Sequence, residues 1–408
     1  MKKFLFNLLI LTAAAASAAA QSFSLDQCRG SRMPYPAPDS VEAVPDTLAP
    51  VMIYHVGRHG ARFATSPDRF LRVEAALEAR SSDLTPAGRS LLDYARRAID
   101  LTADRWGQLD SLGVAEQQGI ARRLCLAFPQ LVVGQQVSAE SSYVGRCVAS
   151  MDAFTGVVRR MQSGLGDIQT ASGPQFNALL RPFQVDSAYV VWSKEKPYEP
   201  VLKAYAKQTA PGEAVVGHFI NDADLDPSDA RKLADDIYYT VSSLAAMGAP
   251  FANEAMELLR PDQYNALLRV DNLRQYLSRT QTTVSSLPAD IAAPLVSDMI
   301  DRIDAFIAGD ETHTLLLHFG HAETLMPLLS LMRVPDCYYL THYFDSVASH
   351  WQSFHVVPMA SNLQVILMRS RTGRYYVRLD LNERPVAYPA HGQILPWPAF
   401  RAYLDQLL

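Results

Sequence analysis

Three apolar segments of the chain have the pattern of buried strands. Residues 50–56 read PVMIYHV, and residues 313–319 read HTLLLHF. Short apolar runs of this length are typical of strands that are covered on both faces of a sheet. Residues 362–383 contain two further runs joined at Arg371-Thr372-Gly373, and this arrangement predicts a β-hairpin.

The segments between these strands have mostly helical periodicity. Apolar residues recur at helical spacing over residues 67–131 and again over residues 150–308, where prolines interrupt the pattern. Strands near both ends of the chain with a helical middle predict an α/β fold, in which a mostly parallel or mixed sheet is flanked by helices. We expect the core of this fold to comprise residues 21–145 and 300–408. A mainly helical inserted domain should comprise residues 146–299.

The first twenty residues, MKKFLFNLLILTAAAASAAA, have the pattern of an export signal. Lys2 and Lys3 form a charged start, an apolar stretch follows, and Ala18-Ala19-Ala20 offers a small-residue cleavage site. The apolar part is too short to span a bilayer, and no later segment approaches about 18 uninterrupted apolar residues. We therefore expect a signal peptide at residues 1–20, cleavage after Ala20, and a bacterial protein that is periplasmic or secreted and has no membrane span.

The charge balance disfavours one class of partner and constrains any anion site. Among the 408 residues, 37 Lys and Arg face 42 Asp and Glu, a net charge of −5, and removal of Lys2 and Lys3 makes the balance more negative still. A nucleic-acid-binding protein normally carries a basic balance, so we expect no nucleic-acid partner. A binding site for an anion must then be a local cluster of cations in a mildly acidic molecule.

The chain contains four cysteines, Cys28, Cys125, Cys147 and Cys337. In an oxidising compartment they allow three disulfide pairings, and the sequence neither chooses among these nor excludes free thiols. None lies in a CxxC spacing, so neither a zinc site nor a dithiol redox site is expected. The oligomeric state is equally open at this point.

The segment after the first strand, YHVGRHGARF, combines two glycines with a cluster of basic side chains. Gly57 and Gly60 allow the backbone to turn sharply and to approach a ligand closely. Arg58 and Arg62 flank His59, and guanidinium groups suit tetrahedral oxyanions such as phosphate. Two permanent cations disfavour protonation of His59, so its ring would stay neutral in acid and be free to attack. Taken alone, RHG is also compatible with a solvated basic turn.

A second strand ends in a similar turn, LLLHFGHAETLMPLL. His321 follows the strand and could donate a hydrogen bond to a phosphate oxygen. Glu323 could protonate a leaving oxygen, a step that a neutral nucleophile leaves undone. The alternative for Glu323 is a carboxylate favoured by the dipole at a helix N-terminus. If the two strands lie side by side and parallel, both turns face the same crevice, where α/β proteins bind ligands.

Together these residues resemble the histidine acid phosphatase family, in the branch that carries RHGxR near the start. Residues 58–62, RHGAR, match that motif without a gap, and Arg146 with Ser150 and Phe154 is similar to the family's R-x-x-x-S-x-x-x-F segment. The distal turn reads HAE where many members have His-Asp. This form looks like the multiple inositol polyphosphate phosphatases, whose members include phytases. The similarity covers residues 50–400 and is weakest in the helical middle.

The resemblance implies an exported phosphomonoesterase that acts on a small phosphorylated substrate and uses no metal or other cofactor. His59 would be the phosphohistidine nucleophile, and Glu323 would donate the proton to the leaving alcohol. The transferred phosphoryl group would be bound by Arg58, Arg62, Arg146 and His321. The leading substrate is an inositol polyphosphate, with phytate first.

Two other functions stay open from the sequence. The enzyme could act on simpler esters, such as sugar phosphates or nucleotides, or the chain could be a periplasmic protein that binds phosphorylated ligands without turnover. Binding alone needs neither a nucleophile nor an acid, which favours an enzyme. Phe63-Ala64 stands where the family often has x-Pro, at a position that helps to shape the pocket wall. Candidate cations for further phosphates, which also read as a solvated face, are Arg69, Arg181, Lys194, Lys196, Lys203 and Lys207.

Overall fold

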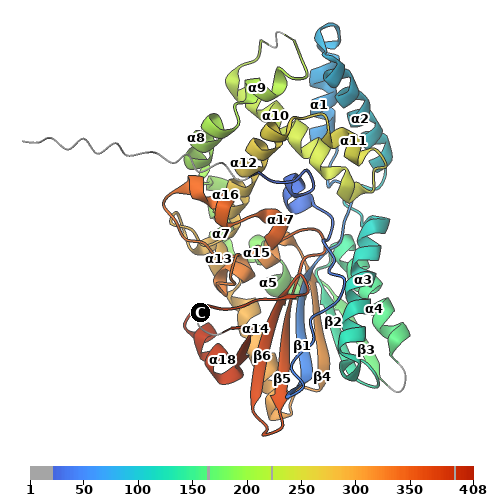
Figure 1. The fold of residues 1–408 in the computed structure, drawn as a ribbon, viewed down its shortest axis with the longest axis vertical. Coiled ribbons are helices and arrows are strands. Elements are labelled where there is room, and N and C mark those ends of the chain that lie inside the picture. The colour runs from blue at the N-terminus through green and yellow to red at the C-terminus, as the bar shows by residue number, and fades with distance from the viewer. Residues whose placement is uncertain (1–21, 163–165, 222–223, 390–391) are drawn as a thin grey trace, which may run out of the picture.

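The chain folds around a mixed sheet (Figure 1). The computed structural model describes residues 22–162, 166–221, 224–389 and 392–408. Within these ranges eight strands lie in the order β3-β2-β4-β1-β5-β6-β7, with β8 paired to β6. Their bounds are β1 Leu48–Arg58, β2 Gln136–Ser141, β3 Asp167–Ser172, β4 His313–Gly320, β5 Asn362–Ser370, β6 Tyr375–Leu381, β7 Arg384–Pro385 and β8 Ile394–Pro396.

The two central strands, β1 and β4, are the apolar runs that the sequence predicts as strands. They pair in parallel, with Arg58 opposite Gly320 at their carboxyl ends, so the two turns that follow them are neighbours. β2 and β3 extend the parallel half of the sheet beyond β4. On the other side of β1, β5 and β6 form the predicted antiparallel hairpin. The predicted α/β fold with a mixed sheet and flanking helices is confirmed.

Helices cover both faces of the sheet, because alternate residues of β1 point into opposite layers. On one face, Ile53 packs with α3 (Ser111–Ala127) and α4 (Gly145–Met161). On the other face, Met52 and Tyr54 pack in a cluster with α14 (Ala293–Ala308), α15 (Ala322–Leu331) and α18 (Trp397–Asp405). This double burial explains why the central strands are apolar along most of their length.

A second group of helices lies at one end of the sheet, above it in Figure 1. α1 (Asp68–Glu78) packs there against α2 (Pro86–Thr102) and α10 (Pro227–Ser243). This layer therefore includes two helices from before the expected insertion at residues 146–299, while the sheet takes β3 from inside that range. The other α-helices of the layer and its surroundings are α5 Asn177–Leu180, α6 Pro182–Val185, α7 Ser187–Glu195, α8 Glu199–Thr209, α9 Gly212–Val216, α11 Ala252–Met256, α12 Pro261–Arg279, α13 Leu287–Asp290, α16 Val347–His350 and α17 Ser353–Val356.

Short 3₁₀ helices complete the secondary structure of the described ranges. They are η1 Gln27–Arg32, η2 Ser81–Asp83, η3 Pro129–Leu131, η4 Pro174–Phe176, η5 Ala245–Met247 and η6 Phe344–Ser346. None of the helices in these ranges is both long and apolar enough to cross a membrane. The predicted signal peptide, residues 1–20, lies outside the described residues.

The four cysteines all lie within the described residues, and all are buried free thiols. Burial raises the pKa of Cys28 to about 12 and that of Cys147 to about 11, so both thiols stay protonated in the acid and neutral range. The structure therefore contains none of the three disulfide pairings that the sequence left open.

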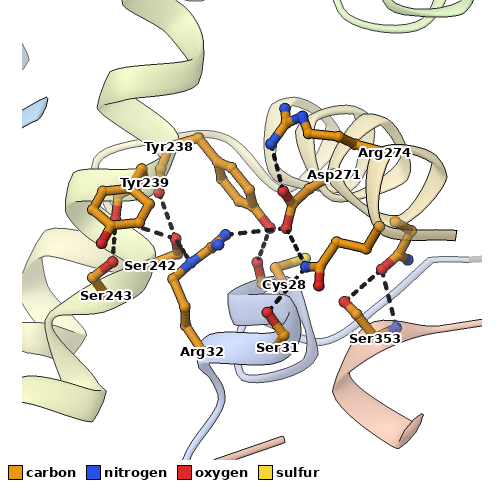
Figure 2. Close-up of polar contacts among 12 residues, drawn as sticks. Cys28, Ser31, Arg32, Tyr238, Tyr239, Ser242, Ser243, Asp271, Arg274 and Ser353 are labelled. Carbon is orange, nitrogen blue, oxygen red and sulfur yellow. Dashed lines mark hydrogen bonds and ion pairs between the residues drawn. The ribbon is translucent and has the colours of Figure 1, made fainter. Parts of the chain in front are cut away.

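The N-terminal arm, residues 22–47, is held against the helical layer by Arg32, whose side chain is mostly enclosed (Figure 2). Arg32, at the end of η1, donates a hydrogen bond from Nε to Ser242 Oγ of α10 at 2.8 Å and another to Asp271 Oδ2 of α12 at 3.3 Å. Its guanidinium lies 5.0 Å from the ring centroid of Tyr238. Asp271 also pairs with Arg274 at 2.8 Å. Burial alone would raise the pKa of Asp271, but the two guanidinium groups hold it below its usual value.

Replacing Asp271 with alanine should lower the free energy of unfolding by roughly 3–5 kcal/mol, because the mostly enclosed Arg32 would lose its buried counter-ion. Urea denaturation of both proteins measures the loss. The matched control is Asp262→Ala, which removes an exposed carboxylate paired with Arg260 on the same helix and should move the midpoint little. Equal losses in the two variants would mean that the Arg32–Asp271 contact contributes little to the fold.

Candidate active site

The RHGAR segment leaves β1 at the carboxyl end of the sheet and turns at once against α3. A Cβ atom added to Gly60 would lie 2.5 Å from the carbonyl oxygen of Gly113, so only glycine allows this approach. Two side chains then fix the backbone of the turn. The Gln117 amide donates to the carbonyl oxygen of Arg58 at 2.9 Å, and the Gly60 N–H donates to the Ser150 hydroxyl at 3.1 Å. The glycine of RHG is thus required by packing.

Glu116 is a buried acid of α3 that hydrogen-bonds the backbone of this turn. Its carboxylate accepts hydrogen bonds from the N–H of Ala61 at 2.7 Å and from the N–H of Tyr35 at 2.8 Å. Burial raises the pKa of Glu116 to about 7, against the lowering effect of the two N–H donors. The sequence analysis missed Glu116 and Gln117, because both act on backbone atoms of a distant segment and no local motif signals that contact.

His59 is held with one ring nitrogen free. Its side chain is buried, and Nδ1 lies 2.9 Å from the carbonyl oxygen of Gly60. Because a carbonyl oxygen only accepts, Nδ1 carries the proton and Nε2 keeps its lone pair. Burial, and after it the positive charges of Arg146, Arg58 and Arg62, hold the pKa of His59 well below its usual value. The ring is therefore neutral in mild acid, the state that the sequence predicts for a nucleophile.

Three arginines surround this ring, and none of them forms an ion pair within the described residues. Arg58 donates to the carbonyl oxygens of Ser31 and Val357, both at 2.6 Å. Arg62 donates to the carbonyl oxygen of a neighbouring residue in the turn. Burial and the charge of Arg62 lower the pKa of Arg58 to about 9, and the same two causes lower the pKa of Arg146. Cations held this close without carboxylate partners favour a bound anion.

His321 caps the start of α15 and joins the two turns. Its ring centroid lies 5.7 Å from that of His59. Nδ1 lies 3.3 Å from a terminal nitrogen of Arg146, which can only donate, so the proton sits on Nε2, 3.1 Å from the Ser142 hydroxyl. Burial lowers the pKa of His321 to about 3. The structure therefore places all four predicted phosphate-binding residues around one spot, with both His321 nitrogens engaged by protein groups.

Glu323 lies in the first turn of α15 and pairs with an arginine from the helical layer. Its Oε1 is 3.3 Å from a terminal nitrogen of Arg279, the last residue of α12. Burial would raise the pKa of Glu323, but Arg279 and then His321 outweigh it and lower the pKa to about 2. The carboxyl is thus ionised in mild acid. The predicted role of Glu323 as proton donor requires its environment to change during the reaction.

Arg181 is a further cation beside the cluster, and the sequence analysis left it among six undecided candidates. It lies between α5 and α6, largely buried, with its guanidinium 4.6 Å from the ring centroid of Tyr143. Its charge contributes to lowering the pKa values of Arg146 and His321. Phe183, two residues later, meets the ring of His321 edge-on at 5.7 Å. Nothing in the local sequence separates Arg181 from a surface arginine.

A cavity of about 770 Å³ lies between α8, α10 and α12 in the helical layer. Four of the six undecided cations, Arg69, Lys196, Lys203 and Lys207, line it, whereas Lys194 does not. Only three acidic residues are in its lining, Glu199, Glu213 and Asp235, against seven basic residues, the four above with Arg231, Lys232 and Arg274. The cavity therefore presents a surplus of positive charge.

The arrangement can bind a tetrahedral oxyanion and present a neutral imidazole to it. Arg58, Arg62 and Arg146 supply fixed positive charge in a largely water-excluded setting, where it acts strongly. His59 supplies a lone pair, and Glu323 supplies a carboxyl from the first turn of α15. Among the described residues, no group of three or more His, Cys, Asp or Glu side chains is arranged to hold a metal ion.

Two curated proteins align with most of this chain. The multiple inositol polyphosphate phosphatase 1 of Homo sapiens is 26% identical over 399 residues, which cover 88% of this chain and 79% of the relative. The multiple inositol polyphosphate phosphatase 1 of Gallus gallus is 23% identical over 367 residues, which cover 85% of this chain and 79% of the relative. These alignments extend over both the sheet and the helical layer.

Solved structures share the fold. The multiple inositol polyphosphate phosphatase of Bifidobacterium longum, in complex with inositol hexasulfate, superposes with a TM-score of 0.72 at 17% identity and covers 93% of this chain and 97% of its own. The phytase from D. castellii gives a TM-score of 0.65 at 12% identity, with 97% and 88% covered. The model of the histidine phosphatase superfamily (branch 2) matches residues 52–382. A match of this extent confirms the resemblance read from the RHGAR and HAE segments, and the chain belongs to the histidine phosphatase superfamily, branch 2.

Proposed function

We propose that this protein hydrolyses inositol polyphosphates, phytate foremost, through a phosphohistidine intermediate on His59. The observation that carries the proposal is a neutral imidazole, with Nε2 free, inside a group of three arginines that have no carboxylate partner among the described residues. Membership of the histidine phosphatase superfamily supports the reaction class. The aligned relatives are named multiple inositol polyphosphate phosphatases, which supports the substrate class.

In the first half-reaction, a phosphate group of the substrate binds against Arg58, Arg62 and Arg146. Nε2 of His59 attacks the phosphorus in line with the bond to the ester oxygen. As the N–P bond forms, that P–O bond breaks, and the protonated carboxyl of Glu323 gives its proton to the departing alcohol oxygen. The arginines stabilise the charge that spreads over the three remaining phosphate oxygens.

In the second half-reaction, water hydrolyses the phosphohistidine. The Glu323 carboxylate, left ionised by the first step, takes a proton from the attacking water. The new P–O bond replaces the N–P bond, which returns His59 to its neutral state and releases inorganic phosphate. The cycle therefore returns one proton to Glu323, and this proton passes to solvent in the empty enzyme, where the carboxyl is ionised.

The surplus of cations supports a substrate with several phosphates. Arg181 lies beside the phosphate-binding arginines, and the cavity between α8, α10 and α12 in the helical layer presents Arg69, Lys196, Lys203 and Lys207. A substrate with several phosphates is attracted by each of these cations, whereas a substrate with a single phosphate contacts only Arg58, Arg62 and Arg146. We also propose export to the periplasm or medium, on the basis of the pattern of residues 1–20.

Replacing His59 with alanine should lower phosphate release from phytate and from p-nitrophenyl phosphate by about 10³-fold or more, because the nucleophile is lost. Release is measured between pH 4 and 7 in the presence of EDTA, which the wild type should tolerate. The control is His350→Ala, an exposed histidine stacked on Tyr339. If the wild type hydrolyses only p-nitrophenyl phosphate, the proposed mechanism stands but inositol polyphosphates are not the substrates. If it hydrolyses neither ester, a protein that binds phosphorylated ligands without turnover is favoured.

Reversing two charges in the cavity should discriminate between substrates. In Lys196→Glu/Lys207→Glu, the ratio of kcat/KM for phytate to that for p-nitrophenyl phosphate should fall about fivefold to tenfold, since only phytate carries additional phosphates. Steady-state kinetics at low ionic strength measures the ratio. Lys194→Glu is the matched control, because Lys194 lies on α7 outside the cavity lining. The same fall in both variants would indicate a general charge effect and no role for the cavity.

A further inference from the structure

The ion pair between Arg279 and Glu323 joins the two layers of the protein inside the candidate active site. Arg279 ends α12 in the helical layer, and Glu323 begins α15, which follows the central strand β4. The two side chains approach to 3.3 Å, yet they keep exposed fractions of 28% and 34%. An ion pair that remains this accessible can exchange its partner for a ligand, in contrast to the less exposed pair of Arg32 and Asp271, at 12% and 4%.

The charged and titratable groups that act on Glu323 come from several elements around it. Apart from Arg279, they are Arg58 of β1, Arg146 and Cys147 of α4, Tyr189 of α7 and His321 at the cap of α15. Arg279 is the strongest of the groups that favour the carboxylate. The hydroxyl of Tyr189 donates a hydrogen bond to the carbonyl oxygen of Ser278, the residue before Arg279, at 2.9 Å.

This environment conflicts with the chemistry expected of Glu323. A general acid must carry a proton at the working pH, and its most effective pKa lies close to that pH. Arg279 and His321 hold the pKa of Glu323 at about 2, so the carboxyl is almost fully ionised between pH 4 and 7. For Glu323 to act as the acid, the ion pair between Arg279 and Glu323 must therefore weaken when substrate is bound.

We propose that Arg279 is a positioning residue that exchanges partners when a substrate with more than one phosphate binds. In the empty enzyme it pairs with Glu323, and in the complex it turns to a second phosphate group of the substrate, next to the one held by Arg58, Arg62 and Arg146. Glu323 is then released to take up a proton. The inference rests on the proposed function and adds a source of selectivity, because a monoester offers no second phosphate to draw Arg279 away.

The proton balance of this exchange is simple. Loss of the Arg279 contact and the approach of the phosphate dianion both favour the neutral carboxyl, so one solvent proton binds a Glu323 oxygen. That O–H bond breaks as the ester P–O bond breaks, and the proton ends on the alcohol oxygen. No oxidant, reductant or additional reactant enters the step.

The test compares esters that differ in their need for an acid. p-Nitrophenolate is a good leaving group and needs little protonation, whereas the alkoxide of glycerol phosphate, a monoester, needs a proton donor. In Arg279→Gln, Glu323 loses the group that lowers its pKa most, so its pKa rises and more of the carboxyl is protonated at pH 5. We expect the ratio of kcat for glycerol phosphate to kcat for p-nitrophenyl phosphate to rise at least about threefold at pH 5. The ratio for phytate to glycerol phosphate should fall.

Two further variants make the outcome decisive. Arg279→Lys keeps the charge and should retain a ratio close to that of the wild type, and Arg302→Gln removes an equally accessible arginine that pairs with Glu311 away from the site. If Arg279→Gln and Arg302→Gln leave both ratios unchanged, or if Arg279→Gln lowers all three rates equally, the exchange is overturned. Failure of the wild type to form phosphohistidine would instead overturn the proposed function itself.

Discussion

The rest of the structure depends on one constraint, a cluster of positive charge at the carboxyl ends of β1 and β4 that has no carboxylate partners within the described part of the chain. Arg58, Arg62 and Arg146 repel one another, and this repulsion adds to burial in lowering the pKa values of Arg58 and Arg146. Such side chains would move apart into solvent unless the fold held them. Two backbone carbonyl oxygens, each 2.6 Å from one terminal nitrogen of Arg58, hold this side chain in place, and its buried Nε has no partner among the described residues.

The N-terminal arm connects this charge to the helical layer. Ser31 supplies one of the two carbonyl oxygens that hold Arg58, and the next residue, Arg32, is fixed by Ser242 and Asp271. Further along the arm, the Tyr35 N–H meets the same Glu116 carboxylate that supports the RHGAR turn. The N-terminal arm therefore connects the RHGAR turn at the end of β1 to helices α10 and α12 of the helical layer.

The sequence predicts those parts of the molecule that have a local signal. The strand runs, the hairpin and the RHGAR and HAE turns are each encoded by a short pattern, and the parallel pairing of β1 with β4 makes the two turns neighbours. Arg279, Arg181 and Glu116 carry no such pattern, because each reaches the site from an element remote in sequence. Phe63 and Ala64, which replace the family's usual x-Pro, are buried in an apolar cluster with Phe70 and face the helical layer.

The central claim is that His59 becomes phosphorylated during turnover. The most direct test is a rapid quench of the enzyme with ³²P-labelled phytate in alkali and detergent, followed by mapping of the labelled peptide. The account predicts a label that is stable to alkali, labile to acid and confined to the peptide that contains His59. Steady phosphate release with no label on that peptide, or with label on another residue, would contradict it.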